Sequence, residues 1–225
     1  MVFSQHSAGP RLAIALIAAV VVAVAGCGRP APGNSIAGQG GVAPAPAPAQ
    51  PPQNAEQPYM VLKPGSVYIY RTASGAQSRM EVREPSDLSD PGSGRTARGY
   101  EMVWEDETVF VTMDKDWVYD VGDLGEGGPM VYKTPKPDFP LFPKQGQTWT
   151  RSFADEFEGA GSFVSTVTGF EAVETPAGKF ERAARVEVTF QSPDGARDHW
   201  VEWYAPGVGR VKTSNGLELV EFKQP

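Results

Sequence analysis

Hydrophobic and polar positions alternate in short runs from residue 59 to the end of the chain. In the segment 185–190, Val186, Val188 and Phe190 alternate with charged or polar residues. A period of two residues places one face of a strand in a core and leaves the other in water. No part of this region keeps a period of 3.6 residues, and Asp155–Gly159 would form one helical turn at most.

The alternating runs are separated by Gly, Pro, Asp and Ser, which is typical of strands joined by tight turns. The pattern predicts twelve strands: Ser66–Thr72, Ser78–Glu84, Arg98–Glu105, Thr108–Met113, Trp117–Val121, Met130–Thr134, Gln147–Phe153, Ser162–Glu174, Phe180–Gln191, His199–Ala205, Gly209–Thr213 and Leu217–Lys223. Segments 192–195 and 214–216 have the composition of hairpin turns. The fold class predicted is therefore all-β, an antiparallel meander that forms a curved sheet or closes wholly or partly into a barrel.

Two segments of this region resemble each other. Residues 61–68 (VLKPGSVY) and 141–149 (LFPKQGQTW) each contain an apolar pair, a turn with Pro, Lys and Gly, and the start of a strand with an aromatic residue. Two half-domains of about 80 residues would begin in this way. Convergence of turn chemistry by chance would give the same pattern.

The beginning of the chain has a different character. Every residue from Leu12 to Ala25 is apolar, and Arg11 precedes the run. A membrane-spanning helix needs about 20 such residues, so this shorter run fits the core of a secretory signal peptide better.

The run ends in Val24-Ala25-Gly26-Cys27, which resembles the lipobox of bacterial lipoproteins. The resemblance implies cleavage after Gly26, attachment of lipid to the Cys27 thiol and acylation, commonly with palmitate, of the new amino terminus. Residues 1–26 would then be the signal peptide. The alternatives are an ordinary signal peptide that contains a cysteine by chance, and an uncleaved anchor helix.

In lipoproteins of this kind an Asp after the lipidated cysteine favours the inner membrane. Residue 28 is Gly, which favours the outer membrane. The location expected is the cell envelope, with the protein facing the periplasm or the outer surface.

Residues 27–58 are rich in Pro, Ala, Gly and Gln and contain few large apolar side chains. Such a segment cannot bury enough apolar surface to offset its ordering entropy, so we expect a disordered, lipid-anchored linker before a β domain at 59–225. The repeated Ala-Pro of 43–48 favours an extended conformation. A spacer is the simpler interpretation, and a Pro-rich ligand for a partner domain is the alternative.

The charge of the β domain is acidic. Without Arg11, Arg29 and Glu56, the 20 basic and 27 acidic residues of the chain become 18 and 26, a net charge of −8. The basic residues are scattered, and this pattern argues against a nucleic-acid partner. An acidic surface is also repelled by anionic lipids, so membrane attachment is expected through the lipid at Cys27.

Two further motifs carry a resemblance. Residues 175–180 (TPAGKF) and 203–212 (WYAPGVGRVK) are similar to motifs of a group of bacterial exported and lipid-anchored β domains. In that group the first motif opens a long strand and the second closes a later hairpin. The resemblance implies a curved antiparallel sheet at the cell envelope, and it implies no catalytic residues.

The sequence contains few candidates for catalysis. His199 follows Asp198 and precedes Trp200, but neighbouring residues of a strand face opposite sides, and no Gly-x-Ser-x-Gly motif marks a nucleophile. A Ser-His-Asp site formed through space stays open, although an isolated strand histidine is the simpler interpretation. We therefore predict no enzymatic activity.

Metal and cofactor motifs are also missing. One histidine in 59–225 and a lipidated cysteine do not supply the ligands of a zinc site. Acidic residues gather in one region, but their spacing differs from that of an EF-hand, and a solvated acidic loop is the simpler interpretation. They are Asp114, Asp116, Asp120, Asp123 and Glu126. The prediction is no metal and no cofactor.

Two functions remain. The first is a non-catalytic binding or structural domain for an envelope protein or a cell-wall component, which predicts a filled interior and an exposed apolar patch. The second is a carrier or sensor of a lipophilic ligand in a β half-barrel. It predicts an apolar cavity lined by residues such as Trp104, Phe110, Trp117, Trp149 and Phe163.

Overall fold

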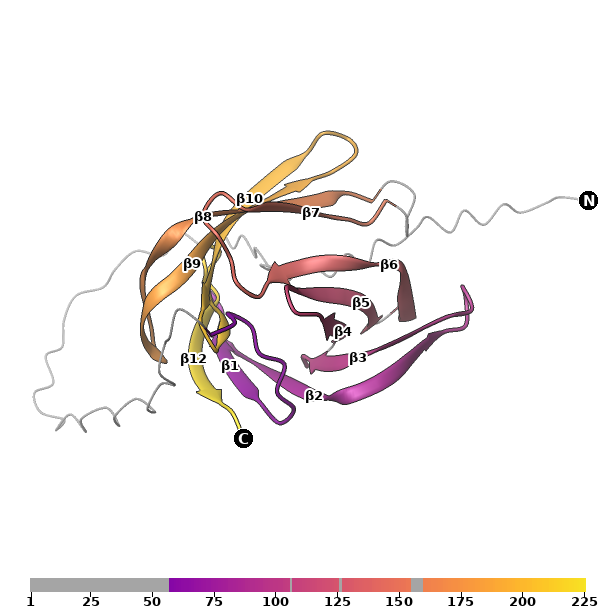
Figure 1. Cartoon of the computed structure of the whole chain (residues 1–225), viewed down its shortest axis with the longest axis horizontal. Coiled ribbons are helices and arrows are strands. Elements are labelled where there is room, and N and C mark those ends of the chain that lie inside the picture. The colour runs from indigo at the N-terminus through magenta and orange to yellow at the C-terminus, as the bar shows by residue number, and fades with distance from the viewer. Residues whose placement is uncertain (1–56, 106, 126, 155–159) are drawn as a thin grey trace, which may run out of the picture.

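The structure, a computed structural model, describes residues 57–225 except 106, 126 and 155–159. Within these residues it consists of twelve β-strands and no helix (Figure 1). No helix long and apolar enough to cross a membrane is therefore found in the described part. The predicted signal peptide, Cys27, nearly all of the linker, Glu126 and the predicted turn at 155–159 lie outside the described residues.

The twelve strands lie close to the predicted positions, and β4 and β11 have the predicted bounds. They are β1 (Val67–Arg71), β2 (Gln77–Asp90), β3 (Arg95–Val103), β4 (Thr108–Met113), β5 (Trp117–Gly125), β6 (Gly128–Pro140), β7 (Thr148–Ser152), β8 (Ser162–Thr175), β9 (Gly178–Gln191), β10 (Arg197–Ala205), β11 (Gly209–Thr213) and β12 (Glu218–Lys223). Two strands run well past their predicted ends. The predicted strands end at Glu84 and Thr134, each just before a proline, but β2 continues through a bulge and β6 is an edge strand, where proline is tolerated.

All strands belong to one antiparallel sheet in the order β6-β5-β4-β3-β2-β1-β12-β11-β10-β9-β8-β7. Successive strands are neighbours, and β1 pairs with β12, so the sheet curls round on itself (Figure 1). β6 and β7 come close together without a ladder of backbone hydrogen bonds. The fold is a nearly closed barrel with one unsealed seam, which confirms the all-β antiparallel meander.

The two similar sequence segments form the same turn. Gly65 and Gly146 both have positive φ, 84° and 81°, which is the conformation that favours glycine. The amide of Gly65 donates to the carbonyl oxygen of Val82, and the amide of Gly146 donates in the same way to Val167, both at 2.8 Å. Each turn leads into a series of six strands, β1–β6 and β7–β12. The barrel is therefore built from two meanders that begin alike.

This arrangement makes the two junctions between the meanders comparable. At the first junction, β1 and β12 pair over most of their length, from Val67 opposite Lys223 to Arg71 opposite Glu218. At the second, β6 and β7 are bridged by side chains. The Trp149 indole nitrogen donates to the carbonyl oxygen of Asp138 at 3.0 Å, and Arg151 forms an ion pair with the Asp138 carboxylate. The junction of β1 with β12 is closed by backbone hydrogen bonds, and that of β6 with β7 by side-chain contacts.

The apolar residues form two larger clusters and one smaller cluster. One larger cluster includes Phe139, stacked on Tyr204 with ring centroids 3.9 Å apart, and the other includes Tyr70, Phe180 and Leu219. The smaller cluster is formed where the ends of β2 and β3 fold against β4, β5 and β6, and its residues are Leu88, Phe110, Val121 and Val131. Residue 122, beside this cluster, has no room for a side chain, because a Cβ on Gly122 would lie 2.3 Å from the carbonyl oxygen of Met130 and 2.7 Å from Cδ2 of Leu88.

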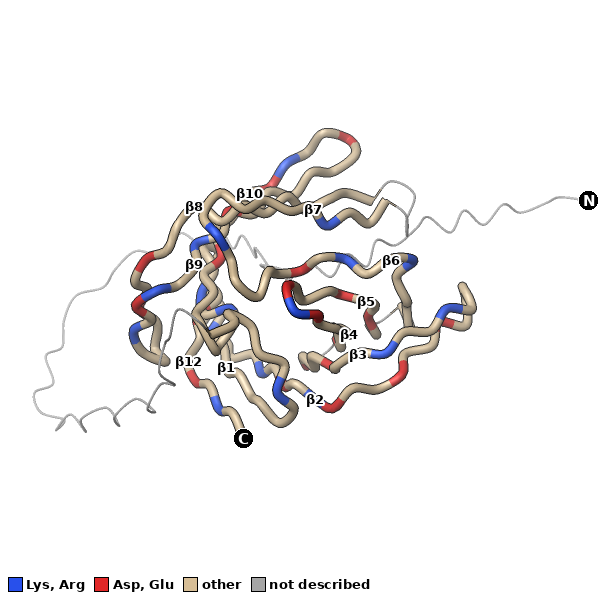
Figure 2. The backbone as a smooth tube through the Cα atoms, viewed as in Figure 1, with Lys and Arg blue, Asp and Glu red and all other residues tan. Residues whose placement is uncertain are grey.

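Charged residues of both signs are interspersed along the strands (Figure 2). Surface ion pairs such as Arg98–Asp87, at 2.9 Å, join neighbouring strands. Exposed pairs of this kind contribute little to stability, typically below about 1 kcal/mol. Larger effects on stability are therefore expected from the buried charged residues than from these surface pairs.

Candidate functional site

The barrel contains a cavity of about 310 Å³, partly open to solvent, between its two meanders. This volume lies at the lower end of the range of small-molecule sites, roughly 300–1,000 Å³. Every strand except β12 contributes residues to the lining. The cavity therefore occupies the centre of the fold.

Most of the wall is apolar. Its apolar residues include four methionines and several aromatic rings: Met60, Leu62, Met80, Val82, Met102, Trp104, Val109, Val111, Met130, Phe153, Phe163, Phe190 and Trp200. Methionine side chains adapt to irregular shapes because they are unbranched and polarizable. The wall is thus suited to an apolar guest of variable shape.

Charged side chains also line the cavity, and the first group lies at the seam. Arg151 Nη1 from β7 lies 2.8 Å from Asp120 Oδ2 of β5 and 2.7 Å from Asp138 Oδ1 of β6. The Arg151 guanidinium carbon also lies 5.1 Å from the centroid of the Phe163 ring, within cation–π distance. One guanidinium therefore serves two carboxylates.

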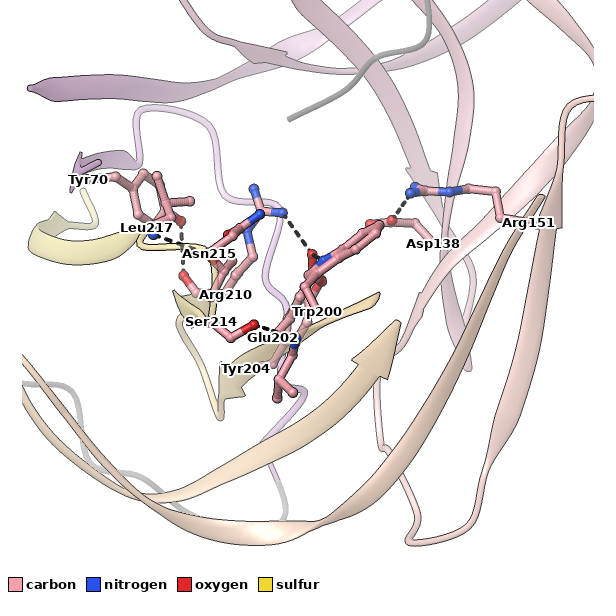
Figure 3. A network of polar contacts seen from close by, with 12 residues as sticks. Tyr70, Asp138, Arg151, Trp200, Glu202, Tyr204, Arg210, Ser214, Asn215 and Leu217 are labelled. Carbon is pink, nitrogen blue, oxygen red and sulfur yellow. Dashed lines mark hydrogen bonds and ion pairs between the residues drawn. The ribbon is translucent and has the colours of Figure 1, made fainter. Parts of the chain in front are cut away.

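The second group lies on β10 and β11. Glu202 accepts hydrogen bonds from the Tyr204 hydroxyl at 2.5 Å and from the Trp200 indole at 2.9 Å. Arg210 Nη1 lies 3.6 Å from the same carboxylate, and its buried Nε has no hydrogen-bond partner. Figure 3 shows Glu202 between this arginine and the Arg151–Asp138 pair.

Burial raises the pKa values of the two acids at the seam, Asp120 and Asp138. The pKa of Asp120 is raised to about 7, first by loss of solvent and then by the Asp138 carboxylate, while Arg151 opposes both. Burial also raises the pKa of Asp138, again against Arg151. Lys136, opposite Asp120 on β6, is buried but does not line the cavity. The Asp120 carboxyl therefore titrates near neutral pH.

The pKa values of two tyrosines beside Glu202 and Arg210 are also raised. Burial and the neighbouring Glu202 carboxylate raise the pKa of Tyr204 well above its ordinary value. Burial raises the pKa of Tyr70 to about 12, although Arg210, whose carbonyl oxygen accepts from the Tyr70 hydroxyl at 2.9 Å, opposes the rise. Both phenols are neutral hydrogen-bond donors at physiological pH.

Strand periodicity brings these residues into the interior. Trp149 and Arg151 are two residues apart on β7, as are Trp200, Glu202 and Tyr204 on β10, so each set shares a face. The signal in the sequence was a charged residue in phase with aromatic residues. Of the residues at the seam, only Asp120 and Trp149 were among the candidates named from the sequence.

The acidic region had been interpreted as a solvated loop, and for two of its members this is wrong. Asp120 and Asp123 lie on β5 and are buried, and Asp123 accepts a hydrogen bond from the Tyr132 hydroxyl at 2.8 Å. Asp114 and Asp116 are exposed in the preceding turn. No group of three or more His, Cys, Asp or Glu side chains that could hold a metal ion occurs among the described residues.

The residues considered for catalysis do not come together. His199 is exposed on β10, with Nε2 3.8 Å from Glu187 Oε2. Asp198 is exposed and borders the cavity, while Trp200 lines it.

Of the five aromatic residues proposed to line a cavity, Trp104 and Phe163 do so. Phe110 belongs to the smaller cluster near β2, while Trp117 and Trp149 pack against each other in the core. The large hydrophobic residues exposed in the described part are Leu124 and Phe142, at 43% and 46%. The interior thus offers a larger apolar site than these two side chains.

Comparisons of the chain with protein-family models, with curated proteins and with solved structures find no match. The site is therefore interpreted from its own chemistry.

We predict that Arg151→Met lowers the free energy of unfolding by about 3 kcal/mol, because it leaves two buried carboxylates without their shared cation. Arg98→Met is the matched control, since Arg98 and Asp87 pair at the surface with side chains 63% and 71% exposed, and it should cost at most about 0.5 kcal/mol. Urea denaturation measures both. An equal decrease in the free energy of unfolding of the two variants would show that the ion pairs at the seam stabilise the protein no more than a surface pair does.

We predict that the free energy of unfolding falls as pH rises from about 4 to about 7. In the unfolded chain an aspartate titrates near 4. The folded protein holds the Asp120 proton up to about pH 7, so it binds more protons than the unfolded chain in this window. Asp120→Asn should make the slope shallower, as measured by urea denaturation at several pH values. An unchanged slope would contradict the assignment of this proton to Asp120.

Proposed function

We propose that the chain is a lipid-anchored protein of the bacterial cell envelope whose β domain binds a small amphipathic molecule inside the barrel, as a carrier or a sensor. The observation that supports this most is the cavity of about 310 Å³ inside the barrel, whose wall is largely apolar but contains paired charges.

The apolar wall would hold the hydrocarbon part of the ligand. Met60, Met80 and Met102 contribute to it from the first meander and the segment before it. Burial of apolar surface contributes about 25 cal/mol per Å², so even a short alkyl chain gains useful affinity there. The methionines would adjust to the chain as it enters.

The polar groups would hold the head of the ligand. Arg210 Nε is a buried donor without a partner, and an acceptor oxygen in the head would satisfy it. The Glu202 carboxylate on the same wall is available to a donor in the head. An amphipathic molecule matches this wall better than a pure hydrocarbon, which would leave these groups unsatisfied.

A surface that binds an envelope partner is the alternative function. That hypothesis expected a filled interior and an exposed apolar patch, and the described residues offer Leu124 and Phe142 as exposed large hydrophobics. The unfilled interior favours a ligand within the barrel.

The anchor follows from the N-terminal sequence. Lipid at Cys27 would hold the protein at a membrane, and a linker of Pro, Ala and Gly would separate the β domain from it. Gly28 favours the outer membrane, with the domain in the periplasm or at the outer surface.

We predict that Met102→Trp weakens binding of the neutral probe N-phenyl-1-naphthylamine at least tenfold, because the larger side chain fills part of the cavity. Thr189→Trp is the control, since Thr189 lies between the inward-facing Val188 and Phe190 and points to the other face of β9. Probe fluorescence measures both with the full-length protein. If wild-type protein fails to bind the probe, or if both variants bind as wild type does, the cavity is not the binding site.

We predict that wild-type protein takes up a clickable fatty acid in growing bacteria and sediments with membranes, whereas Cys27→Ser protein does neither. The thiol is the acceptor of the lipid, and serine does not replace it in thioether formation. Ser35→Ala, in the linker, should be labelled as wild type is. Label on the Cys27→Ser protein would refute the anchor.

A further inference from the structure

The charges that face the cavity do not balance. Three carboxylates, those of Asp120, Asp138 and Glu202, meet two guanidiniums, those of Arg151 and Arg210. Two other acids, Glu107 and Asp198, also contribute to the lining, while no further Lys or Arg does. The lining therefore has an excess of negative charge.

The geometry shows where this excess lies. Arg151 Nη1 is the donor to both Asp120 and Asp138, so a single guanidinium nitrogen serves two carboxylates. Asp120 is the more deeply buried of these two acids, and the cavity reaches it. An acid in this position is stabilised either by a proton or by a second positive charge.

We propose that the ligand of the cavity carries a positively charged ammonium head, which lies among Asp120, Asp138 and Glu202 while its apolar chain packs on the methionine wall. This inference rests on the proposed function and names the chemical class of its ligand. The ammonium donates hydrogen bonds to carboxylates and takes the place of the proton at the seam.

An anionic head fits this lining poorly. It would add a negative charge to three carboxylates, and both guanidiniums are already next to acids. Repulsion between like charges is strong where water is excluded. The unpartnered Nε of Arg210 needs one acceptor, which an uncharged hydroxyl or ether oxygen in the head supplies without adding charge.

The test compares three molecules that differ only in the head: octylamine, octanol and octanoate. At pH 7.5 the first is cationic, the second neutral and the third anionic. Calorimetric titration of the full-length protein should give octylamine an affinity at least tenfold higher than octanol, with octanoate the weakest.

The Asp120→Asn variant tests the site of the charge. It should lower the ratio of octylamine to octanol affinity about tenfold, because a carboxylate beside the ammonium is lost while the shape of the cavity is kept. Asp87→Asn changes the net charge of the protein by the same amount at the surface and should keep the wild-type ratio. Met102→Trp should weaken octylamine binding, which separates binding in the cavity from adsorption to the acidic surface.

The possible outcomes are distinguishable. If octanol or octanoate binds as tightly as octylamine, the cationic head is wrong and the proposed binding function stands. Equal affinity ratios in Asp120→Asn and Asp87→Asn would also overturn the assignment. If neither the octyl compounds nor N-phenyl-1-naphthylamine binds wild-type protein, the proposed function itself fails.

Discussion

The barrel depends on the interaction of Arg151 with Asp120 and Asp138 across the seam between β6 and β7. Eleven of the junctions between neighbouring strands are made by backbone hydrogen bonds, and this one is made by side chains. Backbone pairing is insensitive to side-chain charge, whereas an ion pair in a partly desolvated place is strong only while both partners are present. The shape of the interior is thus tied to the ionisation of a few residues.

The same residues give the cavity its character. A core of this size could have been filled with aliphatic side chains, but three carboxylates and two guanidiniums project into it. Burying charge is costly, and pairing offsets the cost only in part when one guanidinium serves two acids. Stability and ligand recognition therefore compete for the same groups, and a residual negative charge is left facing the open space at the centre.

The likeness between the two meanders explains where the seam lies. Each begins with the same glycine turn, at Gly65 and at Gly146, and each contributes six strands. The junction of β12 with β1 forms a ladder, while the equivalent junction of β6 with β7 does not. β6 carries Pro135, Pro137 and Pro140, which lack the amide that a ladder needs. A repeated meander thus leaves an opening at only one of its two junctions.

The sequence by itself determined the twelve strands, their order as a meander and the two glycine turns, because alternation and turn chemistry are local properties of the chain. It also predicts a leader at residues 1–26 and lipid attachment at Cys27, and both stay predictions. The tertiary structure alone decided that the sheet closes, that Asp120 and Asp123 are buried rather than solvated, and that Arg151 and Glu202 face one cavity. These facts depend on which strands meet after the sheet curls. The register of a strand against a partner distant in the sequence is not determined by its local pattern of residues.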